Sequence, residues 1–171
     1  MNFSNLIKNR YSVRSYKDEP IEKEKLDSVL AAGLCAPTAR NFQPQRIFVA
    51  SSDESKRALA SVCRFTFGAP TVLVLCYDSD RCWQNKLAEG IHSGETDAAI
   101  VGTHMMLAAT ELGLGTCWVA YFNPDDVKRA LDLPQNVTVT ALMPIGYPAD
   151  DAAPLPLHFE SRSIEDTVTE L

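Results

Sequence analysis

Apolar residues recur along the chain at two spacings, one typical of amphipathic helices and the other of buried strands. In residues 21–34 they lie at roughly helical intervals, and Gly33 with Pro37 predicts the end of that helix. A similar apolar stripe runs through residues 95–112 and stops at a GLG sequence, a typical glycine C-cap. Residues 71–77 are short and continuously apolar, as in a strand buried on both faces. The pattern therefore predicts a fold that mixes helices and strands.

Capping residues and shorter apolar runs complete the set of expected elements. Ser4 is a candidate N-cap for the first helix, Ser52 or Asp53 for the third and Asn123 for the fifth. The order of elements predicts an α+β or mixed α/β domain, with a sheet of about four strands covered by helices. The expected helices are 4–9, 21–34, 53–63, 95–112 and 124–131, the expected strands are 46–50, 71–77, 116–120 and 137–146, and residues 11–16 are expected to be extended.

The length of the chain, 171 residues, indicates a single domain spanning residues 1–171, because two domains of half that size would have thin cores. After residue 146 the sequence is rich in proline and poor in large apolar residues. Such a tail cannot form a core of its own. We therefore expect it to lie against another surface, for example that of a partner subunit.

Charge and cysteine content narrow the classes of function. The formal net charge is -6 and no run of Lys and Arg occurs, which argues against a general nucleic-acid or anionic membrane surface. A local anion site remains compatible with this background. The five cysteines are odd in number and lack CxxC spacing, which suits a reducing cytosol. With no signal peptide and no apolar run long enough to span a bilayer, we expect a cytoplasmic protein.

The sequence lacks the common motifs for nucleotide binding, for metal-dependent hydrolysis and for a catalytic serine. GLGLGTCW contains G-x-G, but it follows an expected helix and leads into a strand, the reverse of a dinucleotide-binding fingerprint. Neither a P-loop nor HExxH nor GxSxG occurs. The three histidines are scattered, so they predict neither a metal site nor a triad, and His104 is best explained as structural. We therefore expect no catalytic side chain, and chemistry supplied by a cofactor.

Two arginines and a serine near the N-terminus are the main candidates for ligand binding. In an extended segment, Arg10, Ser12 and Arg14 point the same way, and Val13 turns toward the core. Guanidinium groups bind phosphate oxygens in a bidentate manner and keep their charge at all accessible pH values. The alternative is a solvated pair of surface arginines close to two acidic residues that follow in the sequence.

Four segments, in order along the chain, form a recognisable set of motifs. They are RYSVRSY at residues 10–16, APTARNFQPQR at 36–46, the helix and GLGTCW sequence of residues 97–118, and IGYP at 145–148 with the late Arg162. Together they resemble the nitroreductase family of FMN-dependent oxidoreductases. The matching features of that family are its R-x-S-x-R start, its APS-x-x-N-x-Q-P-W loop, its central helix with the GLG-S/T-C-W strand entry, and its C-terminal signature. The resemblance covers nearly the whole chain.

The resemblance implies a mixed sheet of about four to five strands flanked by helices, in two chains that intertwine as a homodimer. FMN then lies at the interface and is contacted by both chains. The long central helix fits the dimer core, and the tail fits an arm that wraps the partner. NADH or NADPH would act as reductant, and the sequence carries no motif that chooses between them.

The family pattern also implies roles for individual residues of one chain. Arg10 would bind the FMN phosphate, joined by Arg162, and Ser12 would bind the phosphate or the ribityl chain. Arg14 would reach the pyrimidine edge of the flavin, near N1 and O2, where a fixed cation favours the reduced state. Tyr11 completes this N-terminal set of cofactor-binding residues.

The remaining cofactor contacts implied by the resemblance come from three other places in the chain. Residues of the 36–46 loop would come from the other subunit, with three lining the ring and two supplying polar contacts. The backbone around residues 120 and 121 would face the N5 side, and a glycine of the IGYP segment would pack close to the cofactor. These residues are Pro37, Thr38, Ala39, Asn41, Gln43, Ala120, Tyr121 and Gly146.

Some positions depart from the family pattern. Gln45 stands where Trp is common, and Thr38 replaces a serine while keeping the hydroxyl. Tyr121 occupies a position where glycine is frequent, so its side chain either crowds the pocket or points away. Before the second strand, where larger members carry an Asn and a Lys, only Arg64 could substitute as a cation.

The resemblance implies transfer of electrons from NAD(P)H to a small organic acceptor, of the nitroaromatic or quinone type, by a ping-pong mechanism. An alternative is a flavin-binding or redox-sensing protein without significant turnover, which a Tyr121 that fills the acceptor space would favour. A structural dimer with solvated arginines is a third possibility, and it would bind no chromophore.

Overall fold

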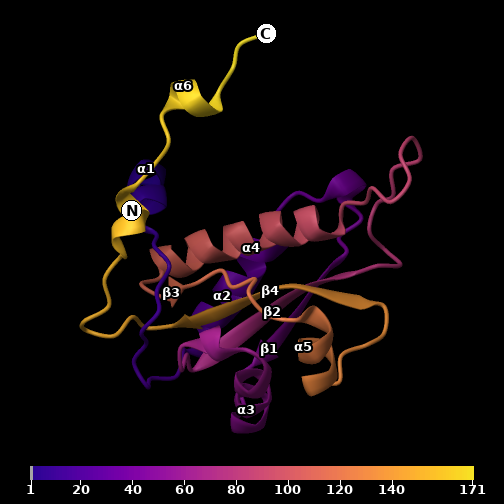
Figure 1. Ribbon diagram of the computed structural model, residues 1–171. Coiled ribbons are helices and arrows are strands. Elements are labelled where there is room, and N and C mark those ends of the chain that lie inside the picture. The colour runs from indigo at the N-terminus through magenta and orange to yellow at the C-terminus, as the bar shows by residue number, and fades with distance from the viewer. Residues whose placement is uncertain (1) are drawn as a thin grey trace.

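The computed structural model describes residues 2–171 and shows a four-stranded sheet in the order β1-β2-β4-β3, with antiparallel neighbours (Figure 1). The expected α+β fold is confirmed. The strands are β1 (Gln45–Ala50), β2 (Thr71–Asp78), β3 (Gly115–Thr116) and β4 (Val137–Gly146). The helices are α1 (Phe3–Asn9), α2 (Lys23–Leu34), α3 (Asp53–Val62), α4 (Gly94–Glu111), α5 (Pro124–Ala130) and α6 (Ile164–Thr167), with short 3-10 turns η1 (Ala39–Asn41), η2 (Arg64–Thr66) and η3 (Pro156–Phe159).

Helices cover both faces of the sheet, with α4 and α2 on one side and α3 and α5 on the other (Figure 1). Strand β2 is buried along its whole length, as its continuous apolar run predicts. Its alternate side chains therefore enter two separate cores: Val72 and Val74 pack with α3 and α5, while Leu73 and Leu75 pack with α2 and α4. No helix among residues 2–171 combines the length and the apolar character needed to cross a bilayer.

Strand β4 contains a bulge at Thr140. Its partner residues in β2 step from Ala141, opposite Leu75, to Val139, opposite Cys76, so that Thr140 is skipped in the register. Because side chains alternate along a strand, one extra residue reverses the face that each later residue occupies. The α3–α5 core accordingly receives Val137 and Val139 from before the bulge, whereas the α2–α4 core receives Ala141, Met143 and Ile145 from after it.

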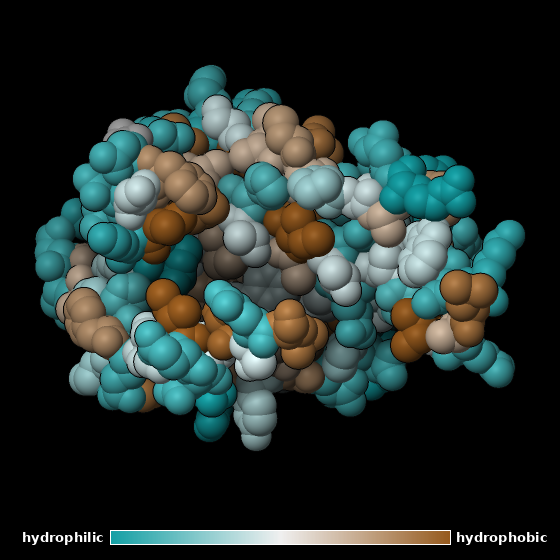
Figure 2. All heavy atoms as spheres, turned by 90° about the horizontal axis from the view of Figure 1, so that it is seen from above, coloured by the Kyte–Doolittle hydropathy of each residue, from teal (hydrophilic) through white to brown (hydrophobic). Residues whose placement is uncertain are grey.

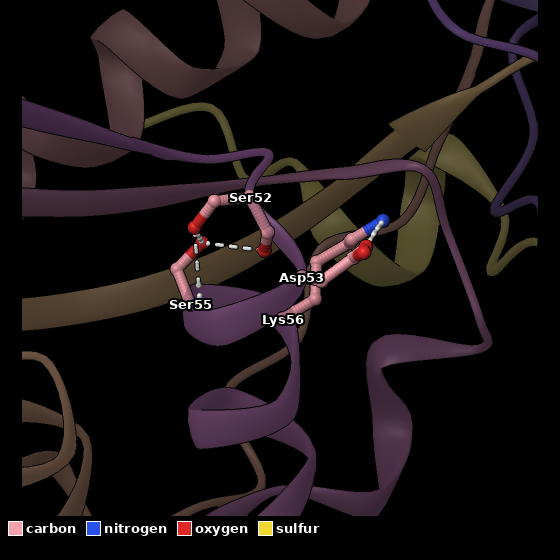
Figure 3. A network of polar contacts seen from close by, with 4 residues as sticks. All are labelled: Ser52, Asp53, Ser55 and Lys56. Carbon is pink, nitrogen blue, oxygen red and sulfur yellow. Dashed lines mark hydrogen bonds and ion pairs between the residues drawn. The ribbon is translucent and has the colours of Figure 1, made fainter.

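The first residues of helices α1 and α3 test two of the predicted N-caps. Helix α1 is capped by Asn2, whose Oδ1 accepts a hydrogen bond of 2.9 Å from the Asn5 N–H, so the prediction of Ser4 as the cap is wrong. Helix α3 is capped by Ser52, whose hydroxyl accepts from the Ser55 N–H at 3.2 Å (Figure 3). The neighbouring Asp53 instead pairs with Lys56 at 3.1 Å, which places its negative charge in the first turn of the helix (Figure 3).

Strand β3 is shorter than the predicted strand 116–120. Pairing runs through Thr116, and the Cys117 N–H then donates to the Pro144 carbonyl at 3.3 Å. Proline has no N–H to complete the reciprocal bond, so the ladder stops at this point. A single bridge, Val119 to Leu142, continues the contact beyond it.

The chain after β4 is largely exposed and leaves the body of the fold, so that α6 stands away from the sheet (Figure 1). Several of its apolar side chains face outward, including Leu157 at 72% and Phe159 at 74% exposure. The expectation that this tail forms no core of its own is confirmed. Figure 2, which views the molecule from the side of α4, shows apolar side chains scattered among polar ones across this face.

A polar cluster joins the start of α2 to the end of β4. The Tyr147 hydroxyl donates to the Glu22 carboxylate at 2.5 Å, and Lys25 contacts both the Tyr147 hydroxyl and, at 3.1 Å, Glu22. The ammonium of Lys25 also lies 4.8 Å from the centre of the Tyr147 ring. These contacts, led by the bond from Tyr147, lower the pKa of Glu22 from 4.5 to about 2.

This cluster predicts a loss of stability in acid. A carboxyl whose pKa is lower in the folded state stabilises the fold above its unfolded pKa and ceases to do so as the pH falls through the folded value. The contribution of Glu22 should therefore be complete above pH 4.5 and vanish toward pH 2. Denaturant midpoints of the wild type and Glu22→Gln should differ at pH 7 and converge across this interval. A difference that does not change with pH would contradict the assignment.

Candidate functional site

The site begins with the extended segment between α1 and α2, which lies beside β3. A parallel bridge pairs Ser12 with Thr116, and the Val13 N–H donates to the Thr116 carbonyl at 2.9 Å. Val13 is 2% exposed and enters the core, so the side chains on either side of it turn outward. Arg10, Ser12 and Arg14 all line one cavity of about 320 Å³, as expected of side chains that share one face of an extended segment.

The C-terminal tail completes this cavity, which the sequence did not predict. Leu155, Leu157 and His158 form its remaining wall together with Tyr11. The Tyr11 hydroxyl donates to the Ala152 carbonyl at 3.3 Å, and its ring meets that of His158 edge-on with centroids 6.3 Å apart. The tail therefore lies over the N-terminal segment and covers the arginines from one side.

The two arginines carry positive charge that no carboxylate neutralises within residues 2–171. In this described range neither Arg10 nor Arg14 takes part in an ion pair, although Arg14 donates through Nη1 to the Ser12 carbonyl at 3.0 Å. A protein of net charge -6 thus keeps two guanidinium groups without a described acidic partner at one cavity. This arrangement favours an anionic ligand, and the forked donors suit phosphate oxygens.

A second cavity, of about 220 Å³, adjoins the first through Arg14, which lines both. Its wall is mostly apolar and aromatic, and it contains the predicted residues Ala120 and Tyr121. Tyr121 is 79% exposed and meets Phe65 edge-on with ring centroids 5.7 Å apart, so it stands at the cavity mouth. The other lining residues are Phe67, Cys117, Trp118 and Val119.

Two ionisable side chains beside these cavities, a thiol and a phenol, are held in their protonated forms. Burial raises the pKa of the Cys117 thiol, which therefore stays protonated at neutral pH. Burial also raises the pKa of Tyr16, whose hydroxyl donates to the Val13 and Pro144 carbonyls. His104 contacts the Ile100 carbonyl within its own helix. Within the described chain no group of three or more His, Cys, Asp or Glu side chains could hold a metal ion.

The predicted loop residues Pro37, Thr38, Ala39, Asn41 and Gln43 line neither of these cavities in the single chain that the structure describes. They form a compact turn instead, in which the Thr38 hydroxyl accepts from the Gln43 N–H at 3.0 Å. The Gln43 side chain donates to Asn41 Oδ1 at 3.1 Å.

Two other predicted site residues also lie elsewhere in the single chain. A Cβ added to Gly146 would come within 2.7 Å of the Pro70 ring and 3.1 Å of the Tyr16 ring, so this glycine permits close packing there. Arg162 is exposed between η3 and α6 and donates to the Asp166 carbonyl at 3.2 Å. The structure therefore brings Arg10, Tyr11, Ser12 and Arg14 together, but not these two residues.

Comparison with known proteins identifies the family. A model described as the nitroreductase family matches residues 7–64 and 61–147. The chain is 38% identical to a nitroreductase family protein of known structure from Clostridium difficile 630, with a TM-score of 0.91 over 99% of this chain and 98% of that one.

Two further relatives carry information about ligands. A structure described as a nitroreductase in complex with FMN, from Desulfovibrio desulfuricans, is 26% identical, with a TM-score of 0.82 over 100% of this chain and 98% of that one. An FMN reductase [NAD(P)H] from Bacillus subtilis is 30% identical over 162 residues, which are 85% of this chain and 65% of that enzyme. The sequence motifs, the fold and these matches agree: the chain belongs to the nitroreductase family.

Proposed function

We propose that this protein is an FMN-dependent oxidoreductase that takes electrons from NAD(P)H and passes them to a small organic acceptor, of the nitroaromatic or quinone type. The single observation that carries the proposal is the pair of unneutralised arginines with Ser12 at one cavity, next to an aromatic cavity that shares Arg14. The relatives described as an FMN complex and an FMN reductase support the choice of cofactor.

The chemistry of these residues fits FMN. Arg10 and Ser12 provide charged and neutral donors for a phosphate, and Arg162 would join them from the tail. Arg14, between the two cavities, would hold its positive charge at the pyrimidine edge of the ring. When bound, FMN supplies the capacity to accept a hydride from a reduced nicotinamide and to pass electrons onward.

The protein's own groups then act by binding, orienting and shielding. The charge of Arg14, which is bonded to the Ser12 carbonyl, would favour negative charge at the edge of a ring held beside it. Phe65, Trp118 and Tyr121 give the second cavity apolar walls, against which a planar acceptor can lie with little water. Protons would come from solvent or from a polar group such as Thr38, and not from Cys117, whose thiol keeps its proton at neutral pH.

We further propose a homodimer with the cofactor at its interface. The loop residues Pro37, Thr38, Ala39, Asn41 and Gln43 would then contact the flavin bound by the other subunit. The tail exposes several apolar side chains, and contact with a second chain would bury them. The free thiols, of which Cys35 is exposed, suit the reducing cytoplasm.

The first test is the visible absorption spectrum of the purified protein, before and after addition of FMN. We expect a flavin spectrum, then oxidation of NADH or NADPH when an acceptor is added. Because both substrates would use the second cavity in turn, double-reciprocal plots should be parallel, and intersecting lines would exclude the ping-pong order.

Two outcomes would redirect the proposal. A protein that stays colourless in the presence of FMN would remove the oxidoreductase function altogether. A protein that holds flavin but oxidises no nicotinamide would favour the alternative of a flavin-binding or redox-sensing protein. The position of Tyr121 at the mouth of the second cavity is the observation on which that alternative rests.

A further inference from the structure

Asp97 is a buried carboxylate that the proposed chemistry does not use. It lies in the first turn of α4 and is 2% exposed. Its Oδ2 accepts a hydrogen bond of 2.6 Å from the Ser93 hydroxyl, and its Oδ1 accepts one of 2.9 Å from the Ala39 N–H. A carboxylate is costly to bury unless such donors and a helix N-terminus stabilise its charge. The groups that donate hydrogen bonds to Asp97 therefore indicate its structural role.

The contacts of Asp97 connect three separate parts of the chain. Ser93 donates to Asp97 and at the same time accepts a bond of 3.1 Å from the Trp83 N–H. One small network thus joins the start of α4, the segment around Trp83 and the loop that contains Ala39. The Ala39 bond ties this loop to the body of the fold across 58 positions of sequence.

The loop that Asp97 holds has a strained backbone. Arg40, Asn41 and Gln43 have φ angles of 51°, 56° and 49°, in the left-handed region that residues with a Cβ seldom adopt. Such conformations persist only where surrounding contacts impose them, and they are concentrated at ligand-binding sites. The turn closes on itself through Thr38, so an external contact is needed to fix its orientation.

We propose that Asp97 is a positioning residue, which holds the Thr38–Gln43 turn in the shape that contacts the flavin of the partner subunit. Asp97 touches no ligand itself and acts through the Ala39 N–H. The inference rests on the proposed function for its ligand, but the fixing of the loop is a property of this chain alone. The proposal predicts that loss of the bond from Ala39 to the Asp97 carboxylate weakens cofactor binding, whereas loss of the bond from Ser93 does not.

The experiment compares Asp97→Ala with Ser93→Ala in the full chain. Asp97→Ala removes the acceptor of the Ala39 N–H, so amide exchange in residues 38–43 should accelerate. Its dissociation constant for FMN should rise about tenfold, because a smaller fraction of the protein has a competent loop. Ser93→Ala keeps the bond to Ala39, so loop exchange should be unchanged and FMN affinity should stay within about twofold. Asp97→Asn, which retains an acceptor oxygen, should recover most of the loss.

Val127→Ala, in the core on the opposite face of the sheet, is the control for general instability. At a matched decrease in melting temperature it should keep its affinity for FMN. Equal loss of FMN by Val127→Ala and Asp97→Ala would overturn the proposal, as would unchanged exchange of residues 38–43 in Asp97→Ala. If Asp97→Ala does not fold, Asp97→Asn, whose neutral amide oxygen is a weaker acceptor, should still exchange residues 38–43 faster than the wild type, and exchange equal to the wild type would overturn the proposal. Wild-type protein that binds no FMN would remove the proposed function, while the exchange data would still decide the role of Asp97.

Discussion

Replacing Arg10 with alanine is expected to raise the dissociation constant of FMN roughly 100-fold. A charge-assisted hydrogen bond contributes about 1.5–3 kcal/mol and a bidentate guanidinium makes two, so the lower limit, roughly 3 kcal/mol, corresponds to about 100-fold. No described carboxylate neutralises Arg10, so its removal takes away binding energy without freeing a buried acid. Fluorescence titration of the stripped protein with FMN measures the change.

Lys8→Ala is the matched control. Lys8 is an exposed cation in the last turn of α1, two positions before Arg10, and it lines none of the cavities beside that residue. Both variants remove one positive charge, so a long-range electrostatic effect would weaken FMN binding equally. We expect Lys8→Ala to bind like the wild type and Arg10→Lys to fall between, because lysine keeps the charge but loses the fork. Equal weakening by the two alanine variants would refute the phosphate assignment.

The second large effect is expected from Gly115→Ala, which should destabilise the fold by about 1–3 kcal/mol. A Cβ on Gly115 would lie 2.4 Å from Cγ2 and 2.8 Å from Cβ of Val13, closer than atoms in a packed core approach. The N-terminal segment would have to move away from β3 to make room. Chemical denaturation gives the change in the free energy of unfolding.

The displacement should also reach the candidate site, because Val13 lies between the outward-facing Ser12 and Arg14. FMN affinity should therefore fall together with stability. Val13→Ala removes both γ-methyls but keeps the Cβ at 2.8 Å, so it relieves part of the clash and the double variant should be more stable than the sum of the single effects predicts. Additive effects would show that the clash is relieved elsewhere and that the glycine does not set the position of the arginines.

Much of the fold follows from local pattern, and the errors have local causes. The continuous apolar run predicts β2 to within one residue, and strand 137–146 is confirmed at both ends. The shortened β3 depends on Pro144, which lies opposite Cys117 only once β4 is in register. Such a long-range pairing leaves no mark on the sequence near β3.

The candidate site also has features that the sequence predicts and features that depend on long-range contacts. The period of two along an extended segment predicts the common face of Arg10, Ser12 and Arg14. It cannot predict that Leu155 and His158 complete their cavity, because the tail returns from the far end of the chain. The sequence also does not predict the left-handed backbone at residues 40–43, because no glycine occurs in this turn. The acid that anchors this turn lies in a different helix.

The bulge at Thr140 gives strand β4 two phases. Up to Val139, odd-numbered residues supply the core beneath α3 and α5; from Ala141 they supply the core beneath α4. The bulge keeps Thr140 out of the ladder, and each half of the strand suits its core only while the bulge is kept. Pairing Thr140 into a regular ladder would turn the second half of the strand inside out, even though no apolar side chain had been altered. Deleting Thr140 would instead leave every apolar side chain on its present face, because Val139 and Ala141 already lie opposite the adjacent residues Cys76 and Leu75. For this strand, a shorter chain is therefore better tolerated than a straightened one.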